Sequence, residues 1–95
     1  MTRKYEMVYI LSSTLADEAL AAAHQRVNEI VSSQASVESF DDWGRRRFAY
    51  EIQDEKEGSY AVLTFTGSTE CPQEIDRVMK ITPNVLRHLI VKLED

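Results

Sequence analysis

The chain has 95 residues, of which 43% are hydrophobic and 28% charged, and its formal net charge is −5. We expect residues 1–95 to form a single domain that folds without staples, and the single cysteine, Cys71, excludes an intramolecular disulfide. No apolar run approaches the ~18 residues of a membrane helix and no signal region opens the chain, so we expect a cytoplasmic protein away from membranes.

The first half is predicted to hold a strand, a helix and a long extended segment. The segment Tyr5–Leu11 is rich in β-forming residues and apolar on both faces, which is typical of a central strand. A helix is expected from Leu15 to about Ser33, with Thr14 as its capping residue. Its apolar positions recur at spacings of three and four: Leu20, Ala23, Val27, Ile30 and Val31.

The extended segment runs from Ser36 to Ile52, and Gly44 within it predicts a bulge or a bend. A polar turn at Asp54–Gly58 and a strand at Tyr60–Thr66 complete a β-hairpin. The final elements are then a helix opening at Cys71 and Pro72 and ending near Thr82, followed by a strand over Val85–Leu93.

The order β-α-β-β-α-β predicts an α+β, ferredoxin-like fold. In this fold four antiparallel strands carry two helices on one face, and the second strand lies on an edge of the sheet. That edge strand would carry an unusual stretch, Trp43 to Ile52, which holds the single tryptophan and three consecutive arginines. An exposed edge with unpaired backbone groups invites a partner chain.

Three adjacent arginines in an acidic chain call for a local explanation. On a strand Arg45 and Arg47 share one face and Arg46 lies on the other, with aromatic residues on either side. Guanidinium groups pair with phosphates and stack on flat rings, so this pattern suits a single-stranded or irregular RNA. The alternative is a solvated strand whose charges are balanced by nearby carboxylates.

The residues give little support for catalysis, and we expect no enzyme activity, cofactor, metal or small-molecule substrate. His24 and His88 are interpreted as surface or rim residues, and Cys71 as an ordinary buried or half-buried thiol. No glycine-rich loop follows the first strand, and the acidic cluster after Ile52 lacks the spacing of a calcium loop. In the third strand, Ser59 and Val62 fall where an RNA recognition motif needs aromatic residues, so that match is poor.

Three regions of the sequence resemble the bacterial-type small-subunit ribosomal protein six family. Arg3-Lys4-Tyr5-Glu6 resembles its opening. The stretch Asp42-Trp43-Gly44-Arg45-Arg46, with Phe48-Ala49-Tyr50 and Ile52, resembles its most specific motif. Asp76-Arg77, Met79-Lys80-Ile81 and Val85-Leu86-Arg87 resemble its closing pattern. Glu51 and Pro83 depart from it, since the family usually has Pro and often Asp there.

This resemblance implies a structural constituent of the small ribosomal subunit. Such a protein would bind the central domain of 16S ribosomal RNA together with small-subunit protein eighteen, in the cytoplasm. Matching motif positions make Arg45, Arg46 and Arg47 RNA contacts with Tyr50 beside them, and Arg3 and Arg87 are the next candidates. Phe40 and Trp43 would pack in the core or against protein eighteen. A second hypothesis is a ferredoxin-like interaction or ligand-sensing domain that dimerises through its edge strand.

Overall fold

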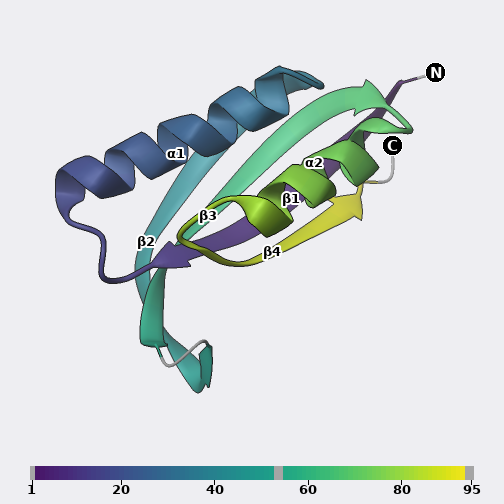
Figure 1. Cartoon of the computed structure of the whole chain (residues 1–95). Coiled ribbons are helices and arrows are strands. Elements are labelled where there is room, and N and C mark those ends of the chain that lie inside the picture. The colour runs from purple at the N-terminus through teal and green to yellow at the C-terminus, as the bar shows by residue number, and fades with distance from the viewer. Residues whose placement is uncertain (1, 53–54, 94–95) are drawn as a thin grey trace.

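The computed structural model describes residues 2–52 and 55–93, and among these it leaves the side chains of 48–52 and 55–56 undescribed. Four strands and two helices follow one another in the predicted order (Figure 1). Their bounds are β1 (Thr2–Ser12), α1 (Asp17–Ser32), β2 (Ser36–Ile52), β3 (Glu55–Ser68), α2 (Cys71–Ile81) and β4 (Val85–Lys92).

All strand pairs are antiparallel, and their order across the sheet is β2-β3-β1-β4. β1 and β3 are therefore central and β2 and β4 form the edges. Both helices cover the same face of the sheet, as Figure 1 shows. The ferredoxin-like prediction, including the edge position of the arginine-bearing strand, is confirmed.

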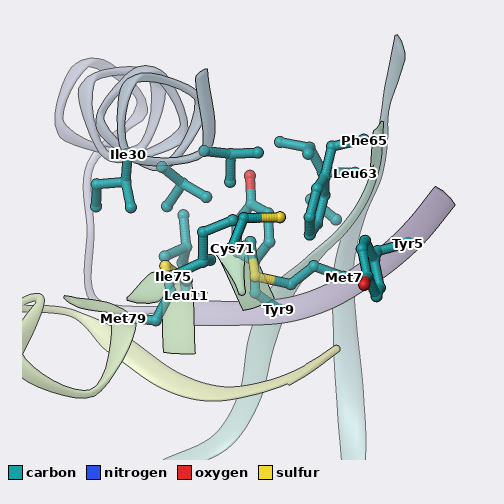
Figure 2. Close-up of a cluster of buried hydrophobic side chains, with 13 residues drawn as sticks. Tyr5, Met7, Tyr9, Leu11, Ile30, Leu63, Phe65, Cys71, Ile75 and Met79 are labelled. Atoms are coloured by element: carbon teal, nitrogen blue, oxygen red, sulfur yellow. The ribbon is translucent and has the colours of Figure 1, made fainter. Parts of the chain in front are cut away.

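The core lies between the two helices and one face of the central strands (Figure 2). On β1 the odd-numbered residues from Tyr5 to Leu11 are buried, and Met7, Tyr9 and Leu11 have no exposed surface. Directly opposite them or nearby on β3 lie Leu63 and Phe65, which are also fully buried. The helices close this layer with residues one helical turn apart: His24, Val27, Ile30 and Val31 from α1, and Cys71, Ile75 and Met79 from α2.

The opposite face of the sheet carries no helix, and we call it the open face. It presents Val8 and Ile10 of β1, and it presents Leu89 of β4, which pairs with Val8. Leu89 is 60% exposed, whereas Ile10 is 7% exposed. Because β1 is apolar on both parities, the sequence pattern could not say which parity faces the helices.

Two local predictions were wrong. Thr14 does not cap α1, which begins after Ala16 with no side-chain hydrogen bond at its cap. Thr14 instead closes the preceding turn, with its hydroxyl 2.8 Å from that of Ser12 and its backbone N–H donating to the same oxygen. The polar segment predicted as a turn at Asp54–Gly58 is strand from Glu55 onward, because cross-strand pairing continues to Ile52 and Glu55. Asp54 lies outside the described residues.

The hairpin of β2 and β3 is longer than the rest of the sheet. β1 ends at Ser12, which pairs with Gly58, so the β3 residues before Gly58 pair with β2 alone. Figure 1 shows this distal part projecting past the ends of β1 and β4. We call Arg45–Ile52 together with Glu55–Glu57 the arginine arm.

Candidate nucleic-acid interface

The three arginines lie on both faces of the arm, at its junction with the sheet. Arg45 pairs with Ser59 and Arg47 with Glu57, whereas Arg46 pairs with Gly58. Neighbouring residues on a strand point to opposite faces. Arg46 therefore lies on the open face, and Arg45 and Arg47 lie on the helix-covered side. All three side chains are exposed, as a surface that contacts a large partner requires.

A β-bulge at the base of the arm redirects β2 just before the arginines. The pairing register shifts between Asp42 and Gly44, and Gly44 has a φ of 77°. Glycine adopts this left-handed conformation without the steric cost that a side chain brings. The Asp42 carboxylate stabilises the bulge by accepting a hydrogen bond from the Gly44 N–H at 2.9 Å. The prediction of a bulge at this glycine is confirmed.

The two carboxylates that directly precede Trp43 make other contacts. Asp41 accepts a hydrogen bond from the Trp43 indole N–H at 3.0 Å, and Asp42 holds the Gly44 amide. Within the described side chains, no carboxylate forms an ion pair with any of the three arginines. Arg26 and Arg77, in contrast, pair with Glu29 and Glu74 on their own helices.

Trp43 extends the cationic surface with a flat ring. Its neighbour Asp41 pairs with Val62, a position on the open face, and Trp43 reaches that carboxylate. The Arg46 guanidinium lies 6.0 Å from the centre of the Trp43 ring, at the outer range of a cation–π contact. With 46% of its surface exposed, Trp43 is free to stack or pack against a partner.

Arg87 and Arg3 lie in different places relative to the arm. Arg87 pairs with Ile10, which in turn pairs with Tyr60 opposite Gly44, so Arg87 is in the row that crosses the base of the arm. Three strand spacings separate β4 from β2, about 14 Å. Arg3 pairs with Gly67, nine residues along β3 from the partner of Arg46, or about 30 Å away. Arg3 therefore does not join this patch.

Phe40 and Trp43 lie on opposite faces of β2. Phe40 pairs with the buried Leu63, and its ring lies 5.4 Å from that of His24 on the helix-covered side. It is 40% exposed, so it borders the core without entering it. A flat partner could not touch both aromatic residues, whereas a partner that wraps the β2 edge could. The side chain of Tyr50 lies outside the described residues.

Each histidine has a defined side-chain partner within the fold. His24 was expected at the surface, but it is 8% exposed and its Nδ1 lies 2.8 Å from the Tyr9 hydroxyl. Its place on the stripe that includes Val27 and Val31 was the signal that could have shown this burial. His88 is half-buried and bonds to Asp76 at 2.6 Å.

Cys71 is 3% exposed, and burial raises the pKa of its thiol, as expected of an unreactive cysteine. Within the described residues, no group of three His, Cys, Asp or Glu residues is arranged to hold a metal ion. In the same part of the chain, neither helix has the length and apolarity that crossing a bilayer demands.

Comparisons with known proteins place this geometry in a family. The family profile described as Ribosomal protein S6 matches residues 4–92. The small ribosomal subunit protein bS6 of Alkaliphilus oremlandii is 40% identical over 91 residues, which cover 96% of this chain and 97% of that protein. The protein of the same name from Clostridium botulinum is 41% identical over 93 residues, covering 97% and 99%.

Solved structures give the same answer for the fold. The crystal structure of 30S ribosomal protein S6 from Thermotoga maritima superposes with a TM-score of 0.91 at 26% identity, covering 98% of this chain and 89% of that one. An uncharacterized protein from the same organism has a TM-score of 0.61 at 14% identity, so it shares the fold alone. The family assignment depends on the sequence matches. The match over nearly the whole length shows that this chain belongs to the ribosomal protein S6 family of the small ribosomal subunit.

Proposed function

We propose that this protein is a non-catalytic constituent of the small ribosomal subunit that binds the central domain of 16S ribosomal RNA jointly with small-subunit protein eighteen. It would do so on cytoplasmic ribosomes, in support of subunit assembly and translation. One observation carries the RNA assignment. Three exposed arginines are consecutive on the arm, and none forms an ion pair with a described carboxylate.

The arrangement of these arginines favours a backbone contact over reading of a base sequence. Arg45 and Arg47 project to one side of the arm and Arg46 to the other, so the arm can lie between two phosphate-bearing segments. Planar guanidinium groups bind phosphate oxygens bidentately. Such contacts position a protein on RNA and carry little sequence information. We infer that Tyr50, on the same strand, adds a stacking contact.

Two positions outside the arm extend this proposal. Arg87 lies across the base of the arm and belongs to the same RNA contact. Arg3 is too distant for that and would contact a separate RNA segment at the other end of the sheet. The net charge of −5 makes these local patches the sites of attraction to RNA.

The open face supports the proposed protein partner. Three of its apolar side chains are exposed by 40–60%: Trp43, Leu89 and Val91. Beside them a shallow cavity of about 340 Å³ is lined by Val8, Ile10, Arg87, His88 and Leu89. Exposed apolar residues on one face are typical of a protein contact. An acidic protein also attracts a basic neighbour, and the two can share one RNA surface.

The test is a salt-dependent binding titration. A fluorescent central-domain 16S RNA fragment is mixed with wild type or with the triple variant Arg45→Ala/Arg46→Ala/Arg47→Ala, with and without protein eighteen. We expect the triple variant to bind about 100-fold more weakly, at about 1 kcal/mol per lost contact. The slope of log K against log salt should flatten by about 2, at ~0.7 per contact with single-stranded RNA.

A matched variant separates the patch from total charge. Arg26→Ala/Arg77→Ala/Lys80→Ala removes the same number of positive charges from the helix surface, where each side chain pairs with a carboxylate. We expect it to bind like wild type. Equal binding by wild type and the arm variant would overturn the assignment of the arginines. An RNA-indifferent dimer on a sizing column would instead support the edge-pairing alternative.

A further inference from the structure

A line of polar groups connects the core to the bulge at the base of the arm. The Tyr9 hydroxyl lies 2.8 Å from His24 Nδ1, and His24 Nε2 lies 3.9 Å from Asp42 Oδ2. The other oxygen of that carboxylate, Oδ1, accepts the hydrogen bond from the Gly44 N–H at 2.9 Å. The line therefore joins β1, α1 and β2, and it ends at Gly44, whose φ is 77°.

His24 is the unusual member of this line. The residue is 8% exposed, and its Nε2 is buried without a hydrogen-bond partner among the described residues. A buried polar atom left unpaired costs free energy. The ring is covered on one side by the edge of Phe40, and Nε2 points toward a carboxylate that is half exposed. His24 Nε2 therefore faces a charged carboxylate but makes no hydrogen bond within the described core.

The neighbouring groups fix the proton positions of the neutral ring. The carboxylate of Asp42 favours a proton on Nε2, and Nδ1 then accepts a hydrogen bond from the Tyr9 hydroxyl. Burial, with a smaller effect of Asp42, raises the pKa of Tyr9, so its hydroxyl keeps its proton. In this state the N–H dipole of Nε2 attracts Asp42 across the 3.9 Å gap.

We propose that His24 is the positioning residue of the arginine arm: it draws the Asp42 carboxylate toward α1, and this carboxylate holds the bulge at Gly44 that sets where the arginines project. Bulges redirect a strand, so a small displacement at Asp42 changes the direction of the whole arm. The consequence for RNA rests on the function proposed above. The link itself is a property of the free protein.

The link is sensitive to pH because protonation turns a dipole into a full charge. An imidazolium attracts the Asp42 carboxylate more strongly and brings the two atoms closer. Tyr9 from β1 and Asp42 from β2 are the titratable groups that face the ring among the described residues, and the β3 residue between them is Ala61. Burial lowers the pKa of His24 and Asp42 partly opposes this, so the tighter state is reached below pH 6.5.

The first experiment follows the free protein by NMR between pH 4.5 and 8.5. We expect the Gly44 amide and the Trp43 indole signals to shift with the same midpoint as the His24 ring. Asp42→Asn should remove the coupling. His88→Gln is the matched control, because His88 of β4 also faces an aspartate, Asp76 of α2. A Gly44 amide signal that does not shift at the midpoint of the His24 ring would overturn the proposal.

Two conservative variants then separate positioning from packing. The side-chain amide of Gln reaches about as far as Nε2, whereas that of Asn reaches about as far as Nδ1. His24→Gln should keep the Gly44 amide shift of wild type and lose its pH dependence. His24→Asn keeps a partner for Tyr9 but loses Asp42, so its Gly44 signal should move. Similar Gly44 signals in both variants would mean that His24 acts only through packing.

RNA titrations complete the test. We expect His24→Asn to bind the RNA fragment about fivefold more weakly than His24→Gln, in the range of couplings between sites that share no ligand contact. If wild type does not bind RNA at all, the proposed function fails while the NMR result still decides the link. If RNA binds but both variants bind equally, the positioning role fails and the RNA assignment stands.

Discussion

The helix-covered part of the sheet and the arginine arm share strands β2 and β3 but depend on different interactions. Phe65 and Leu63 of β3 are fully buried between β1 and the helices. Farther along the hairpin, the β3 residues before Gly58 pair with β2 alone, and the three arginines that begin this part of β2 are exposed. One hairpin thus supplies the core at one end and the binding surface at the other.

This difference teaches where stability and binding can be changed independently. Burial of apolar surface stabilises the covered end, and losing it costs several kcal/mol. Exposed side chains away from the core contribute little to the free energy of unfolding. The bulge between Asp42 and Gly44 lies at the boundary of the two regions, and changes there should affect both.

The largest expected effect is a loss of stability in the helix-covered part of the sheet. Phe65→Ala removes a fully buried ring that stacks 5.5 Å from Tyr5, and we expect a loss of about 3–5 kcal/mol in the free energy of unfolding. Arg45→Ala on the arm is the control and should change it by less than ~0.5 kcal/mol. Urea unfolding followed by circular dichroism measures both. Equal losses would mean that the arm belongs to the cooperative core.

A pair of glycine substitutions sharpens the comparison. At Gly67 a Cβ would lie 2.7 Å from Cys71 Sγ and 2.9 Å from Ala35 Cβ, so Gly67→Ala should cost about 1–3 kcal/mol by overpacking. At Gly44 a Cβ meets nothing within 4 Å, but the positive φ should still make Gly44→Ala cost about 1–2 kcal/mol.

RNA binding should reverse the ranking of these two variants. Gly44→Ala disturbs the bulge before the arginines, so it should weaken binding more than Gly67→Ala, which lies at the far end of the sheet, when both proteins are folded. Thermal melts and the RNA titration give the two readouts. A Gly67→Ala protein that binds RNA more weakly than Gly44→Ala would contradict the separation.

The smallest expected effect is on the stability of the protein at acidic pH. Because burial lowers the pKa of His24 in the folded state, the unfolded chain binds the proton more readily below its ordinary value of 6.5. Stability should therefore fall as the pH drops from 6.5 to the folded-state pKa, with no further loss from this group below it. His24→Gln should flatten this part of the curve, as urea midpoints at several pH values would show. An unchanged slope of stability against pH in His24→Gln would contradict this role of His24.

Much of the fold followed from local patterns. The spacing of Val27 and Ile30, the position of Pro72 and the extent of β2 were all predicted from sequence and are confirmed. These features depend on periodicity, on the fixed φ of proline and on the β-propensity of neighbouring residues, which act over a few positions. The parity of the arginines also followed, because alternation is a property of any strand.

For the candidate site, the sequence by itself determined that three arginines, a tryptophan and a bulge-forming glycine share one edge strand. Only the tertiary structure decided which parity of β1 is buried, because both of its faces are apolar. It also decided that His24 is enclosed and faces Asp42, that Thr14 closes a turn, and that Arg3 is far from the arm. These outcomes depend on contacts between residues distant in the chain, and such contacts leave no local pattern in the sequence.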